Sequence, residues 1–348
     1  MRKVILIALA ILVSLPISLS SAAEQKNVKE LTGLSDFELI RAMQEMSAGL
    51  GVGCDFCHAR KGNDLDFPSD DKKEKKTARE MIAMTKAANT STFNGRSTVS
   101  CYTCHRGKEN PTGLVPLPVA PPAAEEAEKT ERPTMPATAD VVKKYAEAAG
   151  DTARWGSLRA KGVRESADGK QSSPFELEAA GGKYHVVAET PRGKMEQTVS
   201  GDQGWMKGGP EPRPMNANDL ARFRDAASAW EPVDPKDINT DPKGSRVVRK
   251  EKIGEHETYA LFTSLGPKSR QRLYFDTTTG LLVRRVVLTD TPVGTFPSQT
   301  DYDDWKDVGG TKYPFVVKVT SPDWRNAAVR KYAEVTLGAK IDEKVFEK

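Results

Sequence analysis

The feature that most constrains this chain is a pair of five-residue motifs that uses all four of its cysteines. Residues 54–58 read CDFCH and residues 101–105 read CYTCH, so both match C-x-x-C-H. This pattern is typical of c-type haem attachment: two thiols add to the porphyrin vinyl groups, and the adjacent histidine ligates the iron. We therefore expect two covalently bound haems, attached through Cys54, Cys57, Cys101 and Cys104, with His58 and His105 as proximal iron ligands.

Paired cysteines also occur in zinc sites and in disulfides. A Cys₄ zinc site also uses two C-x-x-C units, but it does not require a histidine directly after each unit. A disulfide between cysteines this close in sequence removes little conformational entropy from the unfolded chain, so it stabilises little. The doubled C-x-x-C-H pattern therefore favours haem over zinc or disulfides.

The N-terminus has the layout of a secretory signal peptide. Arg2 and Lys3 precede an apolar run over 4–19, and small residues follow up to Ala23. The apolar run is shorter than the roughly 20 residues of a spanning helix, and the small residues favour cleavage. We expect a signal peptide over 1–23 and a periplasmic protein, with membrane association left open. Haem attachment outside the bacterial cytoplasm agrees with this location.

Methionines are the candidate distal iron ligands. The chain has four histidines, and apart from His58 and His105 they lie far from the motifs, at His185 and His256. Upstream of each motif stands an R-x-M-x-x-M repeat, with Met43 and Met46 in the first copy and Met81 and Met84 in the second. Methionine is a common sixth ligand, and it also fills irregular gaps in cores. The spacing does not say which methionine of each pair ligates, and a vacant sixth site is the alternative.

The residues around each methionine pair predict a helix. Ser35 followed by Glu38 is a capping box, and apolar residues then recur at helical spacing until the glycine-rich stretch 49–53. The second helix is predicted to begin near Asp70 and Asp71 and to end at Asn89 as its C-cap.

The stretch 31–116 resembles the cytochrome c subunit of photosynthetic reaction centres. The matching residues are Met43, the first motif, the segment AREMIAM at 78–84 and the segment VSCYTCHRG at 99–107. The resemblance implies that Met43 ligates the first haem and Met81 the second, while Met46 and Met84 pack. Long members of that family hold four haems, whereas this chain has one pair of motifs, so docking on a reaction centre is not implied.

Beyond the motifs the composition changes twice. Prolines, alanines and glutamates fill 117–140, which predicts an extended linker. Residues 141–348 begin with a short helix over 141–150 and then alternate at period two, which predicts about ten antiparallel strands. We therefore expect an α+β protein in which a helical dihaem domain (24–116) precedes a curved-sheet or half-barrel domain (141–348). The expected strands include 184–190, 194–199, 247–253, 258–263, 271–275, 281–288, 302–308, 313–319 and 330–337.

The sheet domain weakly resembles the LolA-like lipoprotein carriers. The supporting residues are Gly204-Trp205, the hairpin over 274–282, and the segment 302–305 before Tyr313-Pro314. That family binds acyl chains in a concave face, so the resemblance implies an apolar ligand or an envelope protein as a partner of this domain.

The leading functional hypothesis is electron transfer between redox partner proteins through two His/Met-ligated haems. The alternatives are a peroxidase-like enzyme with an open haem site, and a haem-bearing scaffold that binds lipid or lipoprotein or senses redox state. No GxSxG, HExxH or P-loop motif is present, so no separate catalytic apparatus is expected. The formal charge of +4 and the absence of a basic aromatic stripe argue against nucleic acid as a partner.

Overall fold

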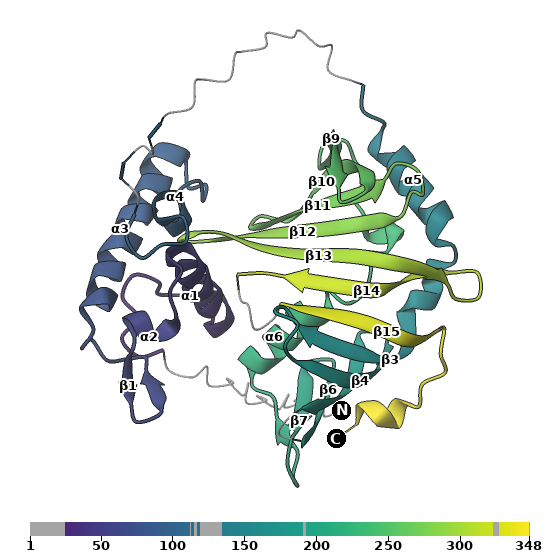
Figure 1. Cartoon of the computed structure of the whole chain (residues 1–348), viewed down its shortest axis with the longest axis horizontal. Coiled ribbons are helices and arrows are strands. Elements are labelled where there is room, and N and C mark those ends of the chain that lie inside the picture. The colour runs from purple at the N-terminus through teal and green to yellow at the C-terminus, as the bar shows by residue number, and fades with distance from the viewer. Residues whose placement is uncertain are drawn as a thin grey trace, which may run out of the picture.

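The computed structural model describes residues 25–111, 113–114, 117–118, 134–190, 193–322 and 327–347. Helices dominate its N-terminal part and one large sheet dominates the rest, as Figure 1 shows. The predicted α+β architecture is therefore confirmed. The predicted signal peptide and most of the predicted linker lie outside the described residues. Within the described part, no helix is long and apolar enough to cross a bilayer.

The helical part is built from two long helices and the two short helices that carry the motifs. A small antiparallel hairpin of two strands follows the first motif. The elements are α1 (Asp36–Leu50), α2 (Cys54–Cys57), β1 (Ala59–Lys61), β2 (Asp64–Asp66), α3 (Lys73–Phe93) and α4 (Cys101–His105).

Helix α1 begins and ends where the sequence predicts. The Ser35 hydroxyl accepts a hydrogen bond from the backbone N–H of Glu38, and the Glu38 carboxylate accepts one from the backbone N–H of Ser35. Gly51 ends the helix in the left-handed conformation (φ 68°), which glycine adopts without the Cβ clash of other residues.

The predicted C-cap of the second helix was wrong. Helix α3 continues past Asn89 to Phe93, and Asn94 is the left-handed cap (φ 54°). The Asn89 side chain is buried and binds the segment before the second motif instead. The buried Asn89 side chain needs hydrogen-bond partners and finds them outside the helix. This long-range requirement outweighs the local preference of asparagine for a C-cap position.

The C-terminal part is a single antiparallel sheet of 13 strands in the order β8-β7-β6-β5-β4-β3-β15-β14-β13-β12-β11-β10-β9. Figure 1 shows it as a strongly curved sheet with α5 and α6 beside it. The strands are β3 (Ser157–Ser166), β4 (Ser172–Ala180), β5 (Lys183–Thr190), β6 (Gly193–Ser200), β7 (Gln203–Lys207), β8 (Arg213–Pro214), β9 (Ser245–Ile253), β10 (His256–Gly266), β11 (Ser269–Asp276), β12 (Leu282–Thr291), β13 (Gly294–Asp307), β14 (Lys312–Thr320) and β15 (Ala328–Leu337).

Two α-helices and three short 3₁₀ turns complete this part. They are α5 (Thr138–Ala149), α6 (Ala217–Ala227), η1 (Thr152–Gly156), η2 (Pro235–Asp237) and η3 (Glu343–Phe346). Helix α6 and strand β3 were not predicted. Alternation is clear only at the start of β3, where Leu158 and Ala160 are buried, and its remaining residues are mostly half-buried.

The main hydrophobic core lies between the sheet and these helices. Tyr145 of α5 is fully buried and packs against Phe275 of β11, with ring centroids 5.1 Å apart. From α6, Phe223 packs edge-on to Trp230, with centroids 5.6 Å apart. The helices and their aromatic side chains thus fill much of the space that the curved sheet encloses.

The two parts meet where the β12–β13 hairpin reaches the helical part. Val293 at the hairpin tip has no exposed surface and belongs to a cluster with Leu31, Ala42 and Ile82 of the helical part. Helix α1 also contacts α6, and its Arg41 forms an ion pair with Asp225 of α6. The helical part therefore shares buried surface with the sheet, although the long linker separates them in sequence.

Candidate haem-attachment site

Each motif forms a short helix of its own, as the attachment chemistry requires. Helix α2 spans the first cysteine pair and is followed by His58, whose backbone N–H donates to the Cys54 carbonyl. Helix α4 spans the second pair and ends at His105, with Arg106 as a left-handed cap (φ 51°). In both motifs a single helical turn therefore presents two thiols and the following imidazole together.

The motifs pack crosswise against the long helices. The first motif helix, α2, contacts α3, and the second, α4, contacts α1. The contact between α1 and α4 is very close, because a Cβ on Gly49 would lie 3.0 Å from the Cys101 Cβ. The backbone N–H of Gly107 donates to the Gly49 carbonyl at 2.8 Å. Glycine at position 49 thus allows the second motif to lie directly on α1.

The His105 ring is oriented by backbone carbonyls. Its Nδ1 lies 3.1 Å from the Lys108 carbonyl oxygen and 2.9 Å from that of Glu109. A proton on Nδ1 satisfies these acceptors and leaves Nε2 as the nitrogen with a free lone pair. Metal-ligating histidines are commonly oriented by such a bond to the second nitrogen. This orientation is consistent with the predicted role of His105, which stays a prediction.

The His58 ring has a different environment. Its Nδ1 is buried and has no hydrogen-bond partner among the residues that the structure describes. The ring stands edge-on to Phe67, with centroids 5.0 Å apart. Burial lowers the pKa of His58, and the positive charge of Lys75 lowers it further, so the neutral imidazole is favoured. The neutral imidazole keeps a nitrogen with a free lone pair, which is the form that ligates a metal ion.

None of the four cysteines forms a disulfide in this structure. Burial raises the pKa of Cys57, and it raises that of Cys101 to about 11. Reactive catalytic cysteines have lowered pKa values, so these two thiols do not have the character of activated nucleophiles. Among the described residues, no three Cys, His, Asp or Glu side chains are grouped to hold a metal ion. The two motifs therefore do not form one Cys₄ site in this structure.

The candidate methionines fall into two groups by burial. Met43 and Met46 are partly buried and pack against the cluster of Leu31, Ala42 and Val293. Met81 and Met84 are 39% and 54% exposed on α3. The structure thus places both pairs on the long helices that the sequence predicts, and the choice of ligand within each pair stays a prediction.

Exposed apolar side chains are concentrated near the motifs. Phe67 and Tyr102 are 56% and 60% exposed, and they join Met81 and Met84 among the large apolar residues exposed in the helical part. Tyr102 belongs to the second motif, and Phe67 packs against His58 of the first. An exposed apolar side chain at each motif is consistent with a hydrophobic group bound there.

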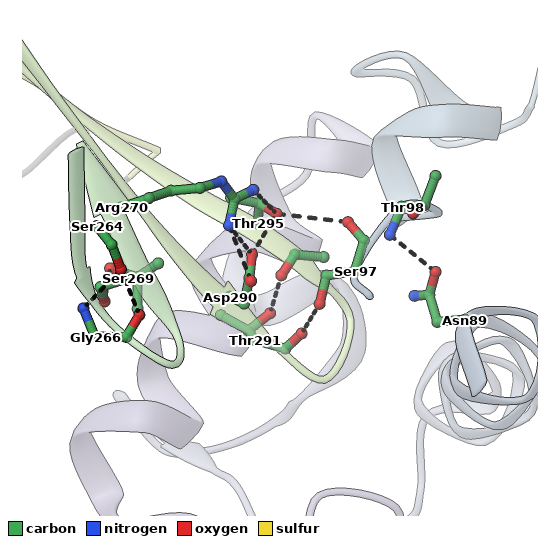
Figure 2. A network of polar contacts seen from close by, with 12 residues as sticks. Asn89, Ser97, Thr98, Ser264, Gly266, Ser269, Arg270, Asp290, Thr291 and Thr295 are labelled. Carbon is green, nitrogen blue, oxygen red and sulfur yellow. Dashed lines mark hydrogen bonds and ion pairs between the residues drawn. The ribbon is translucent and has the colours of Figure 1, made fainter. Parts of the chain in front are cut away.

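Asn89 was not predicted as part of the site. Its side-chain N–H donates to the Val99 carbonyl at 2.8 Å, and its side-chain oxygen accepts from the backbone N–H groups of Thr98 and Val99 at 3.0 and 2.8 Å. Figure 2 shows the bond to Thr98, and beside it the Ser97 hydroxyl donating to the Thr291 carbonyl of the hairpin. Asn89 therefore fixes the segment that leads into the second motif, and its position in a helix gave no signal of this.

Glu45 was also not singled out. It is buried on α1, and its carboxylate accepts a hydrogen bond of 2.8 Å from the Thr291 hydroxyl. Burial raises the pKa of Glu45 to about 7. A Cβ on Gly294 would fall 1.8 Å from the Glu45 carboxylate and 2.5 Å from the Ser100 Cβ, so the hairpin backbone touches both α1 and the residue before Cys101.

Taken together, the site defines a class of protein. Each C-x-x-C-H motif forms its own short helix. The His105 ring is oriented by backbone carbonyls, and burial favours the neutral form of His58. These features are consistent with c-type haem binding.

Comparison with known sequences gives the family of this part. The family described as the photosynthetic reaction centre cytochrome C subunit matches residues 16–152. The chain is also 38% identical over 90 residues to the photosynthetic reaction center cytochrome c subunit of Rubrivivax gelatinosus. That match covers 25% of this chain and 23% of the relative's length. Residues 16–152 therefore carry a domain of the reaction-centre cytochrome c subunit family, which confirms the resemblance seen in the sequence.

The rest of the chain is similar to solved structures of the LolA superfamily. A LolA superfamily protein from Nitrosomonas europaea is 14% identical, with a TM-score of 0.39 and coverage of 62% of this chain and 99% of that one. A putative outer membrane lipoprotein-sorting protein domain from Vibrio parahaemolyticus is 10% identical, with a TM-score of 0.37 and coverage of 59% and 95%.

Proposed function

We propose that this protein is an exported dihaem c-type cytochrome that transfers electrons between redox partner proteins. The observation that carries the proposal is the doubled C-x-x-C-H helix within a domain of the reaction-centre cytochrome c family. Bound at these motifs, haem iron would supply one-electron redox chemistry. The chain's own residues would hold the two groups close together and set how much water reaches them.

Each set of residues has a separate task in this proposal. Cys54 and Cys57 anchor the first group, and Cys101 and Cys104 anchor the second. His58 and His105 bind iron through Nε2. A methionine from each R-x-M-x-x-M repeat completes the coordination, Met43 for the first motif and Met81 for the second. Thioether ligation favours electron transfer over ligand binding, because it closes the sixth position.

The first experiment counts covalent haems. The protein would be expressed with the cytochrome c maturation machinery, purified, and examined by intact mass and by a pyridine haemochrome assay. We expect two haems per chain, one in a Cys54→Ala/Cys57→Ala variant and one in a Cys101→Ala/Cys104→Ala variant. A colourless protein, or one whose mass equals that of its polypeptide, would overturn the proposal.

The second experiment separates electron transfer from enzymatic function. Single Met→Leu substitutions at Met43, Met46, Met81 and Met84 would be compared by the methionine–iron charge-transfer band and by spin state. We expect each of Met43→Leu and Met81→Leu to lose about half of the band's intensity, because the other haem keeps its methionine, and we expect Met46→Leu and Met84→Leu to keep all of it. A high-spin haem in the unsubstituted protein would instead favour the peroxidase-like alternative.

Location and partners complete the proposal. A signal peptide over 1–23 would deliver the chain to the periplasm, where the sheet domain would contact an envelope protein or an apolar ligand. N-terminal sequencing of the mature protein from a periplasmic fraction tests the first statement. A mature chain that starts at Met1 in the cytoplasmic fraction would contradict it.

A further inference from the structure

A cavity lies where the helical part, α6 and the sheet meet. It has a volume of about 70 Å³. Residues from α1, from the α6 region and from strands β3, β13, β14 and β15 line it, so both parts of the protein contribute walls. A cavity needs about 10–15 Å³ to hold one water, so this one has room for a small ion of several heavy atoms.

Arginines dominate the polar lining of this cavity. Arg41, Arg164, Arg222 and Arg330 line it, and Asp225 is the one acidic residue among the described residues of its wall. Arg41 is paired with Asp225. Among the described lining residues, cationic side chains therefore outnumber acidic ones four to one. Because the guanidinium is planar and presents several N–H donors in a rigid fork, it suits the oxygens of a phosphate or carboxylate.

Aromatic rings in the lining lie beside two of these guanidinium groups and reduce their contact with water. The Arg330 guanidinium lies 4.2 Å from the ring centre of Trp230, and that of Arg41 lies 4.4 Å from the ring centre of Phe37. Burial lowers the pKa of Arg330 to about 10, and the nearby charge of Arg164 contributes to the lowering. Arg330 is partly buried. A partly desolvated cation beside a like charge is costly, and an anion in the cavity would offset that cost.

We propose that this cavity binds an oxyanion of the phosphate class, through the guanidinium groups of Arg222 and Arg330 and with Trp230 as an apolar wall. The anion is either free phosphate or the headgroup of an anionic lipid. Because α1 belongs to the wall, a bound anion would also hold the helical part against the sheet. The proposal does not depend on the haem sites and goes beyond electron transfer.

The test uses the full-length mature holoprotein and two probes. Inorganic phosphate is titrated calorimetrically, and binding to phosphatidylglycerol vesicles is compared with binding to phosphatidylcholine vesicles. Arg222→Ala removes an exposed residue of α6 that lines the cavity, so the fold should persist. Arg330→Lys keeps the partly buried charge but loses the planar fork. Arg224→Ala is the matched control, because Arg224 lies on the same helix but binds Asp202 at 3.3 Å away from the cavity wall.

We expect one phosphate per chain, at least tenfold weaker binding in Arg222→Ala and in Arg330→Lys, and a change below twofold in Arg224→Ala. Binding to phosphatidylglycerol vesicles without phosphate binding, in the same order of variants, would support the headgroup as the source. The proposal is overturned if neither probe binds, or if Arg224→Ala loses as much affinity as Arg222→Ala. Haem content is measured on the same samples, so a failure of haem attachment can be distinguished from a failure of anion binding.

Discussion

At the scale of single residues, glycines decide how closely the second motif approaches α1. Gly51 has φ 68°, and a Cβ there would lie 2.1 Å from the Gly107 carbonyl oxygen. Gly62 in the β1–β2 turn has a similar φ of 64° but has no neighbour within 4 Å of such a Cβ. The two positions share the same backbone strain on substitution and differ in packing.

Gly51→Ala should therefore destabilise the protein more than Gly62→Ala. A non-glycine residue in the left-handed region costs about 1 kcal/mol, and this is the whole expected effect at Gly62. At Gly51 the clash with the Gly107 backbone adds to it, so we expect roughly 2–4 kcal/mol in total. Urea denaturation of both holoproteins measures the difference. An equal decrease in the free energy of unfolding in both variants would show that the close contact between α1 and the second motif does not contribute to stability.

A second residue-scale prediction concerns Glu231, which lies between the sheet and α6. Burial raises the pKa of Glu231 from its ordinary value of 4.5 to about 7. The negative charge of Glu231 contributes to the raised pKa values of Tyr184, Tyr313 and Tyr332. Between these two pH values the native state holds a proton that the unfolded state has lost. The free energy of unfolding should therefore be highest near pH 4.5 and fall as the pH rises through 7.

Glu231→Gln should make this dependence less steep, while Glu45, whose pKa burial also raises to about 7, keeps its share in both proteins. The Glu231 share of the decrease should be on the order of 2–3 kcal/mol, at about 1.36 kcal/mol for each pH unit. The free energy of unfolding of Glu231→Gln, relative to that of the unmodified protein, should therefore be highest at pH 8. Chemical denaturation at intervals from pH 4.5 to 8 measures the profile. Glu255→Gln is the control, because the Glu255 side chain is 96% exposed. Parallel profiles for the protein and Glu231→Gln would contradict the prediction.

At the scale of elements, the β12–β13 hairpin joins the two parts of the molecule. Its tip residue Val293 is completely buried, and its Thr291 bonds to Glu45 and Ser97 of the helical part. Figure 2 shows the bond between Ser97 and Thr291, with the ion pair of Arg270 and Asp290 (2.8 Å) beside it. The sequence predicted the strand over 281–288 but not this role, because a long-range contact leaves no periodic signal in the residues that make it.

Val293→Ala should weaken the hairpin contact. Removing two buried methyl-sized groups costs about 0.8 kcal/mol for each, and the cavity left behind adds to that, so we expect roughly 1.5–3 kcal/mol. Val248 on β9 is 36% exposed, and Val248→Ala should stay within about 0.5 kcal/mol of the unmodified protein. Denaturant midpoints of the two variants provide the comparison, and a small effect at Val293 would show that the hairpin tip is not held by packing.

At the scale of the whole molecule, the elements that depend on local sequence were mostly predicted, whereas the contacts that depend on long-range packing were mostly missed. Capping residues located α1, the motif spacing located the short helices α2 and α4, and alternation located most strands. Helix α6 was missed although Asn216 and Asp219 form a capping box at its start. The roles of Asn89 and Glu45 could not be read from the sequence, because each depends on a partner, Val99 or Thr291, that only the folded chain brings near.

The shared buried surface predicts that the helical and sheet parts unfold together. All five tryptophans lie in 155–324, so their fluorescence reports on the sheet part, while haem absorbance would report on the helical part. In the unmodified holoprotein the two signals should change at the same denaturant concentration, as expected for a cooperative transition. Val293→Asp places a charge in an apolar cluster, where burial is costly, so the hairpin should leave its site. The two signals should then separate, with a lower midpoint for haem absorbance.

Val248→Asp provides the matched control for this separation, since it adds the same charge at an exposed position of the same sheet. Its two signals should still coincide. Separate transitions in the unmodified protein would mean that the contact between the parts contributes little free energy. Coincident transitions in Val293→Asp would mean that the remaining contacts, chiefly that between Arg41 and Asp225, suffice to join the parts. Coupling of this kind would let binding at the sheet alter the stability of the haem-binding helices, because both belong to one cooperative unit.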